Sequence, residues 1–80
     1  MNLKKFALHS AELDLEFESD SLFDIYKEMK RLKQDDKEHH DKKEYYVTKQ
    51  LPDPNGSNAI FITEGKVYKR GNKYFFKERD

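Results

Sequence analysis

Apolar and acidic residues alternate near the amino end of the chain. Leu13, Leu15 and Phe17 are separated by single carboxylates, from Glu12 through Glu18. Successive side chains of a strand point to opposite faces. This period of two therefore predicts a strand with one apolar and one acidic face.

The apolar spacing changes to three and four residues after Ser21. The residues of this stripe are Leu22, Ile25, Met29 and Leu32. Such a stripe is typical of an amphipathic helix, and Ser21 followed three residues later by Asp24 resembles a helix cap. We expect a helix over about residues 22–34.

Two other stretches leave their structure open. Phe6 and Leu8 fit a strand within residues 2–9, but Leu3, Phe6 and Ala7 also fit a helical turn. Residues 34–44 are almost all charged or histidine, so they form either a solvated helix extension or a mobile loop. We expect this second stretch to contribute nothing to the core.

The carboxyl half alternates strand patterns with turn residues. The expected strands cover residues 45–51, 59–63, 66–70 and 73–78. A loop at 52–57 follows the first of them, because proline and Asn-Gly favour turns. Glu64-Gly65 and Gly71-Asn72 then provide two-residue hairpin loops, so the last three strands form a meander.

The chain predicts a single α+β domain over residues 1–80. One helix packs on a small, mostly antiparallel sheet in the order β-β-α-β-β-β-β, with the first strand uncertain. Eighty residues, 35% of them apolar, supply material for one core. The expected core comprises Leu15, Phe17, Ile25, Met29, Ile60, Ile62, Val67, Tyr74 and Phe76.

Composition narrows the classes of function. The chain has no cysteine, which excludes disulfides, thiolate zinc ligands and thiol nucleophiles and suits a cytoplasmic protein. No stretch approaches the roughly 20 apolar residues of a membrane span, so we expect no membrane partner. The 16 basic and 16 acidic residues cancel, so no general attraction to nucleic acid is expected.

The first candidate binding surface is an acidic row. It comprises Glu12, Asp14, Glu16, Glu18, Asp20 and Asp24. Carboxylates repeating every second residue along a strand could mimic the phosphates of nucleic acid and occupy a basic groove on a protein partner. The more ordinary interpretation is the charged outer face of a half-buried strand, and we favour it.

The second candidate surface lies on the predicted meander. The two hairpin loops would align Phe61, Tyr68 and Phe75 across one sheet face. The basic border of this row comprises Lys66, Arg70, Lys73 and Lys77. The rings could stack unpaired bases while the cations follow phosphates, but the neutral total charge favours packing or a protein interface.

Catalysis and metal binding have little support. Asp36 and His40 would share a helix face, yet no apolar residue anchors that segment, so we expect no metal site. His9 next to Ser10 does not make a catalytic dyad from adjacency alone. We expect no enzyme activity and no cofactor.

The leading hypothesis is a small, non-enzymatic, protein-binding accessory or regulatory module. An inhibitor that uses the acidic strand or a sheet face would be one form of it. One alternative is a single-stranded nucleic-acid-binding protein that uses the aromatic and basic meander face. Another is a structural protein that forms homo-oligomers such as a homodimer. A protein partner is favoured over nucleic acid.

Overall fold

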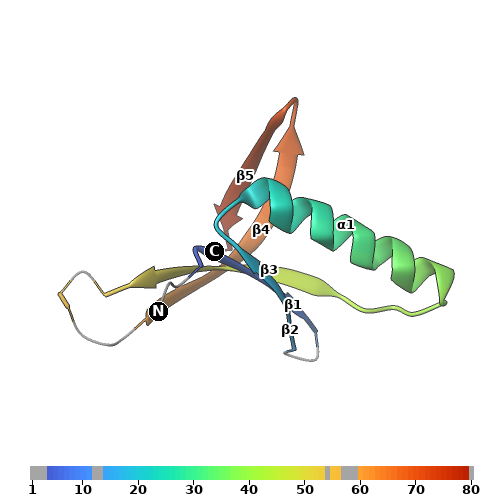
Figure 1. Cartoon of the computed structure of the whole chain (residues 1–80), viewed down its shortest axis with the longest axis horizontal. Helices are drawn as coiled ribbons and strands as arrows, with labels where there is room; N and C mark the ends of the chain where they lie inside the picture. The colour runs from blue at the N-terminus through green and yellow to red at the C-terminus, as the bar shows by residue number, and fades with distance from the viewer. Residues whose placement is uncertain (1–3, 12–13, 54, 57–59, 80) are drawn as a thin grey trace.

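The computed structural model describes residues 4–11, 14–53, 55–56 and 60–79, and Figure 1 shows their arrangement. The elements are β1 (Phe6–Ser10), β2 (Leu15–Ser19), α1 (Leu22–Glu38), β3 (Tyr45–Pro52), β4 (Ile60–Arg70) and β5 (Lys73–Glu78). The strands form one antiparallel sheet in the order β2-β1-β3-β4-β5, with α1 packed against it. This arrangement confirms the predicted α+β class.

The uncertain first element is a strand, and it lies inside the sheet. β1 pairs with β2 on one side and with β3 on the other. Phe6, Ala7, Leu8 and Ser10 are buried, which leaves only His9 partly exposed. The two strand neighbours satisfy the backbone of this segment, which excludes the helical turn.

A bulge interrupts the predicted alternation in β2. Leu8 pairs with Phe17 and His9 pairs with Leu15, so Glu16 is an extra residue in the ladder. One extra residue turns everything beyond it to the other face. Leu15 is consequently 55% exposed, and its predicted place in the core is wrong. Glu12 and Leu13, which belong to the same alternating pattern, lie outside the described residues.

The helix extends four residues beyond its predicted end. It runs to Glu38, and His39 caps it before His40 adopts a positive φ of 59°. Asp36 is buried and accepts a hydrogen bond from the Tyr45 hydroxyl. No residue of 34–44 belongs to the apolar core, as expected, but Asp36 is a buried polar contact that the sequence did not indicate. No helix in the described part of the chain is long and apolar enough to cross a membrane.

The two strands predicted at 59–63 and 66–70 are one strand, so the hairpin at Glu64-Gly65 is wrong. β4 pairs with β3 from Ile60 to Gly65 and with β5 from Gly65 to Arg70. A Cβ atom on Gly65 would lie 2.3 Å from the Lys77 carbonyl oxygen. Glycine is required there for close approach of the neighbouring strand, not for a turn.

The second predicted hairpin is confirmed. Arg70 pairs with Lys73 across Gly71 and Asn72, and Gly71 has a φ of +63°. A positive φ in a two-residue loop is the conformation that glycine adopts at little cost.

The long β4 strand changes the predicted register. Ile62 lies opposite Gln50 of β3 and not opposite Val67. Ile60 and Ile62 are exposed, so their predicted burial is wrong. The pairing of Val67 with Phe76 is confirmed.

The core lies between α1 and the middle of the sheet. Its buried residues are Phe6, Leu8, Ile25, Val47 and Val67. Partly buried side chains complete it, namely Phe17, Leu22, Tyr26, Met29, Leu32, Tyr45 and Phe76. The predicted burial of Ile25 and Val67 is confirmed, whereas Phe17, Met29 and Phe76 lie at the margin.

The substitution Gly65→Ala should destabilise the protein by about 1–3 kcal/mol, as overpacking does. The added methyl group would meet the Lys77 backbone and the Phe76 ring, which lies 2.6 Å from the Cβ position. Urea unfolding measures the change. Gly71→Asn serves as the control, because nothing lies within 4 Å of that Cβ position and asparagine tolerates a positive φ. Equal stability of Gly65→Ala and the wild type would contradict the close approach.

The substitution Tyr45→Phe should lower the free energy of unfolding by about 1–2 kcal/mol, because it leaves the buried Asp36 carboxylate without its donor. Burial first, and the hydrogen bond to Asp36 second, raise the pKa of Tyr45 above its ordinary value of 10. The protonated phenol therefore stabilises the folded state fully below pH 10, and this contribution is lost as the pH rises above that value.

Urea unfolding near neutral pH and above pH 10 tests this contribution. The wild type should lose more stability than Tyr45→Phe over that interval. Asp36→Asn keeps an acceptor oxygen and should cost less at neutral pH than Tyr45→Phe. Identical stability of Tyr45→Phe and the wild type at both pH values would contradict the bond.

Candidate binding surfaces

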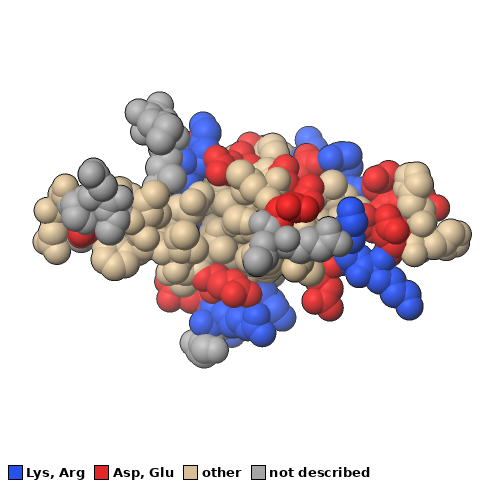
Figure 2. All heavy atoms as spheres, turned by 90° about the horizontal axis from the view of Figure 1, so that it is seen from below, with Lys and Arg blue, Asp and Glu red and all other residues tan. Residues whose placement is uncertain are grey.

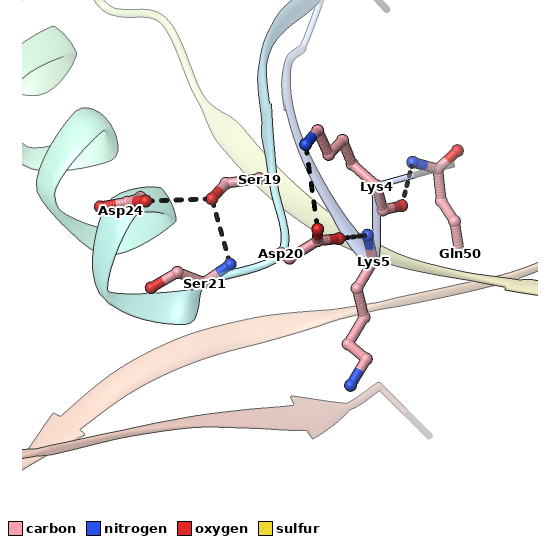
Figure 3. Close-up of polar contacts among 7 residues, drawn as sticks. All are labelled: Lys4, Lys5, Ser19, Asp20, Ser21, Asp24 and Gln50. Carbon is pink, nitrogen blue, oxygen red and sulfur yellow. Dashed lines mark hydrogen bonds and ion pairs between the residues drawn. The ribbon is translucent and has the colours of Figure 1, made fainter. Parts of the chain in front are cut away.

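The acidic row is distributed over several environments. Glu16 stands at the bulge, and its charge is one of those that raise the Tyr45 pKa. Asp20 is engaged with the amino-terminal segment: one carboxylate oxygen accepts the Lys5 backbone N–H at 2.8 Å, and the other lies 3.9 Å from the Lys4 ammonium (Figure 3). Among the described residues, these acids do not repeat regularly along one strand face.

Asp24 takes part in the helix start through Ser19. The Ser19 hydroxyl donates to the Asp24 carboxylate at 3.1 Å and accepts the Ser21 backbone N–H at 3.0 Å, as Figure 3 shows. Ser21 is the N-cap residue, but its side chain makes no capping hydrogen bond. The predicted cap position is confirmed, while the bridging hydroxyl belongs to a residue that sequence spacing did not indicate.

The β4–β5 hairpin brings together most of the predicted aromatic and basic face. Tyr68 lies opposite Phe75, and their rings stack with centroids 5.4 Å apart. Alternate residues of the two strands share their side of the sheet. This surface, which we call the basic-aromatic face, comprises Lys66, Tyr68, Arg70, Lys73, Phe75 and Lys77. All six side chains are exposed.

Phe61 does not belong to the basic-aromatic face. It lies seven residues before Tyr68 on one strand without a register shift, which places it on the opposite side of the sheet. The predicted three-ring row is therefore wrong, and its physical cause is the missing hairpin at Glu64-Gly65.

The other side of the β4–β5 hairpin packs on the helix. Val67 and Phe76 join the core, and the Tyr74 ring lies 5.2 Å from the rings of both Phe23 and Tyr26. These contacts hold the hairpin as it rises beside α1 (Figure 1). The basic-aromatic face thus lies on a hairpin whose other side is packed against the core and the helix.

A second exposed surface was missed by sequence reasoning. We call it the arm: residues 50–52 of β3 and 60–63 of β4, which project away from the helix (Figure 1). Its large apolar side chains are exposed: Leu51 (42%), Ile60 (48%), Phe61 (56%) and Ile62 (63%). Figure 2 shows this end of the molecule as a mostly tan surface, whereas charged side chains gather elsewhere.

A sequence signal for the arm does exist. Between Gln50 and Thr63 the only charged residue is Asp53, although charged residues make up 40% of the whole chain. The alternating pattern instead predicts burial of Ile60 and Ile62, since apolar residues at alternate positions are usually buried. The absence of any covering element opposite them could not be read from the pattern.

A cleft of about 530 Å³ opens between the start of β3 and the part of β4 beyond Gly65. Val47, Val67 and Met29 line it together with charged side chains of both signs. One basic member, Arg79, is already paired with Glu64 at 2.9 Å. This mixed lining defines no single complementary ligand.

The histidines have local structural partners. The His39 ring donates to the Asp35 carbonyl, and this bond, together with the Asp35 charge, raises the pKa of His39. His9 Nε2 lies 3.0 Å from the Thr48 hydroxyl oxygen, while Ser10 is buried. Within the described ranges, no three His, Asp or Glu side chains group as metal ligands.

The substitution Ser19→Ala should lower stability by about 0.5–2 kcal/mol, because it removes the hydroxyl that links Ser21 and Asp24 at the helix start. Ser21→Ala is the matched control and should cost less, since that side chain makes no capping bond. Thermal unfolding of both variants measures the difference. A larger loss for Ser21→Ala would show that the hydroxyl bridge is misassigned.

Known proteins offer no comparison for these surfaces. Neither the protein-family models, nor the curated proteins, nor the solved structures contain a match to this chain.

Proposed function

We propose that the protein is a non-enzymatic protein-binding module of the cytoplasm, and that it binds by adding a partner strand to the free edge of β4 in the arm. The observation that carries this proposal is the exposure of Ile60, Phe61 and Ile62 on that edge, at 48%, 56% and 63%. Ile60 and Ile62 lie on one side of the sheet and Phe61 on the other, and exposed apolar surface of this kind marks interaction sites of folded proteins.

The backbone of this edge is available for pairing. The Arg79 N–H donates to the Glu64 carbonyl at 2.9 Å, so Glu64 turns its backbone groups toward the β5 side. Antiparallel strands alternate the direction of these groups, so Ile62 and Ile60 turn theirs to the same side. Pairing with β5 ends at Gly65 and Glu78, and no other described strand covers residues 60–64 on that side.

The opposite edge of the sheet is protected in a way that the β4 edge is not. β2 carries Glu16 and Glu18, and Asp20 follows it directly. Charged residues on an edge strand discourage the addition of another strand. Residues 60–63 carry no charge, so this edge favours strand addition by both hydrogen bonding and apolar contact.

The partner we propose is a second copy of this chain. A two-fold axis at Phe61 would place Ile60 of each copy opposite Ile62 of the other, and each such pair exchanges two N–H···O hydrogen bonds. The two Phe61 side chains would meet across the axis. An uncharged segment meeting itself causes no electrostatic repulsion, which supports pairing between identical copies.

Several observations support the non-enzymatic and cytoplasmic parts of the proposal. His9 contacts the Thr48 hydroxyl, and both Thr48 and Ser10 are buried, so neither hydroxyl is accessible to a substrate. The complete absence of cysteine suits a reducing compartment.

The substitution Ile62→Pro tests the proposal. The Ile62 N–H points outward, so proline removes a donor of the free edge without removing a bond to β3. The wild type should form a concentration-dependent dimer in sedimentation or light-scattering measurements. Ile62→Pro and Ile62→Lys should shift the dissociation constant upward by tenfold or more, corresponding to about 1.4 kcal/mol.

Leu15→Lys is the matched control, because it also adds a lysine in place of an exposed apolar residue but lies on the opposite edge strand. It should leave the dimer intact. A wild type that remains monomeric up to millimolar concentration, or a dimer that resists both Ile62 substitutions, would overturn the proposal.

A further inference from the structure

The β4–β5 hairpin carries a second surface that strand addition at the arm does not use. The basic-aromatic face places Tyr68 and Phe75 at its centre, with one pair of cations on each side. Lys66 lies opposite Lys77, and Arg70 lies opposite Lys73. No carboxylate belongs to this set of six residues.

The cation pairs oppose folding. Like charges directly opposite one another on neighbouring strands destabilise a sheet. In the described part of the chain, no ion pair joins any of these four side chains to a carboxylate. The protein therefore keeps two repulsive pairs on one hairpin, one on each side of the aromatic pair, and an anionic ligand would relieve this repulsion.

The aromatic pair at the centre of the face indicates a second property of such an anionic ligand. The Tyr68 and Phe75 rings lie nearly parallel, at 24°, and remain 44% and 37% exposed. Rings that stack on each other leave their outer faces free for another planar group. The ligand that complements the whole face is thus anionic and carries planar apolar rings.

We propose that the basic-aromatic face binds single-stranded nucleic acid. Unpaired bases stack on aromatic side chains while lysine and arginine contact the phosphates. A duplex keeps its bases stacked inside and offers the rings nothing, and an acidic peptide supplies charge without regular planar groups. The neutral total charge does not oppose this binding, because the four cations are concentrated on one face.

The arrangement of the hairpin supports this assignment. Its opposite side is fixed to the helix and the core through Val67, Tyr74 and Phe76. A rigid sheet that presents rings and cations on alternate residues is a general way to hold a single strand. The Phe61 ring is not required, since it lies on the other side of the sheet.

Fluorescence anisotropy with a labelled oligothymidine of about 12 nucleotides tests the proposal, a length within the usual range for one binding face. Removing one stacking ring with Tyr68→Ala should weaken binding about 5- to 150-fold, the range expected from the loss of one stacked base. Four phosphate contacts predict a log–log salt dependence with a slope of up to about −2.8, at roughly 0.7 per contact.

The double variant Lys66→Gln/Lys77→Gln separates binding from folding. It should weaken oligonucleotide binding while raising the Tm of the free protein by about 1–6 °C, because one repulsive pair is removed. Lys42→Gln/Lys43→Gln makes the same change in net charge on the exposed segment before β3 and should retain the affinity. Ile62→Pro should also bind the short strand normally, which distinguishes this face from the arm.

Several outcomes would overturn the proposal. The first is the absence of salt-sensitive binding by the wild type at micromolar protein. The second is equal affinity of Tyr68→Ala and the wild type. The third is equally tight binding of polyglutamate or of vesicles rich in phosphatidylserine, which would assign the face to acidic proteins or anionic membranes.

Discussion

The sheet depends on one backbone position where three strands overlap. Gly65 pairs with Val47 of β3 and with Glu78 of β5, and it is the only β4 residue that has a partner in both strands. Gly65 is buried, and an added side-chain carbon would collide with β5. Because the overlap is one residue long, the first half of β4 pairs only with β3 and the second half only with β5. The arm lacks a neighbour on one edge for this reason, and the cleft opens on the other side of the same point.

One helix covers one side of this sheet, and the opposite side is closed differently. Ile25 is completely buried where α1 crosses the central strands. On the uncovered side, the His9 ring stacks on Tyr46 with centroids 5.1 Å apart and contacts Thr48. Ala7 is 1% exposed although no helix lies over it. Small residues among longer side chains therefore close the middle of that side, while the arm and the β4–β5 hairpin leave their side chains exposed.

Sequence patterns predicted the elements better than the connections between them. The stripe from Leu22 to Leu32 and the strand from Tyr45 located their elements because each has a regular period over several residues. Glycine had two meanings: at Gly71 it permits a positive φ, whereas at Gly65 it permits close approach of β5. Single-sequence reasoning cannot separate these two roles, because the second depends on a strand that has not yet been placed.

The candidate surfaces were predicted correctly where a local loop sets the pairing, and wrongly where the pairing depends on distant strands. Tyr68 and Phe75 were correctly paired because a two-residue loop fixes their register locally. Phe61 was misplaced by the wrong hairpin at Gly65, and Leu15 by the bulge at Glu16. The exposure of the arm follows from what fails to cover it, a property of the whole sheet. The misplacement of Phe61 and of Leu15 and the missed arm thus all arise from the pairing of segments that the local sequence pattern does not determine.

The continuous run of β4 through Gly65 relates its two surfaces to each other. Ile62 and Tyr68 lie an even number of residues apart, so their side chains occupy the same side of the sheet. A two-fold axis perpendicular to the sheet would keep that side common to both copies. The two basic-aromatic faces would then lie on one side of the joined sheet and could engage one long strand together. Linked sites of this kind raise the apparent affinity through effective concentration, without any additional contact in either face.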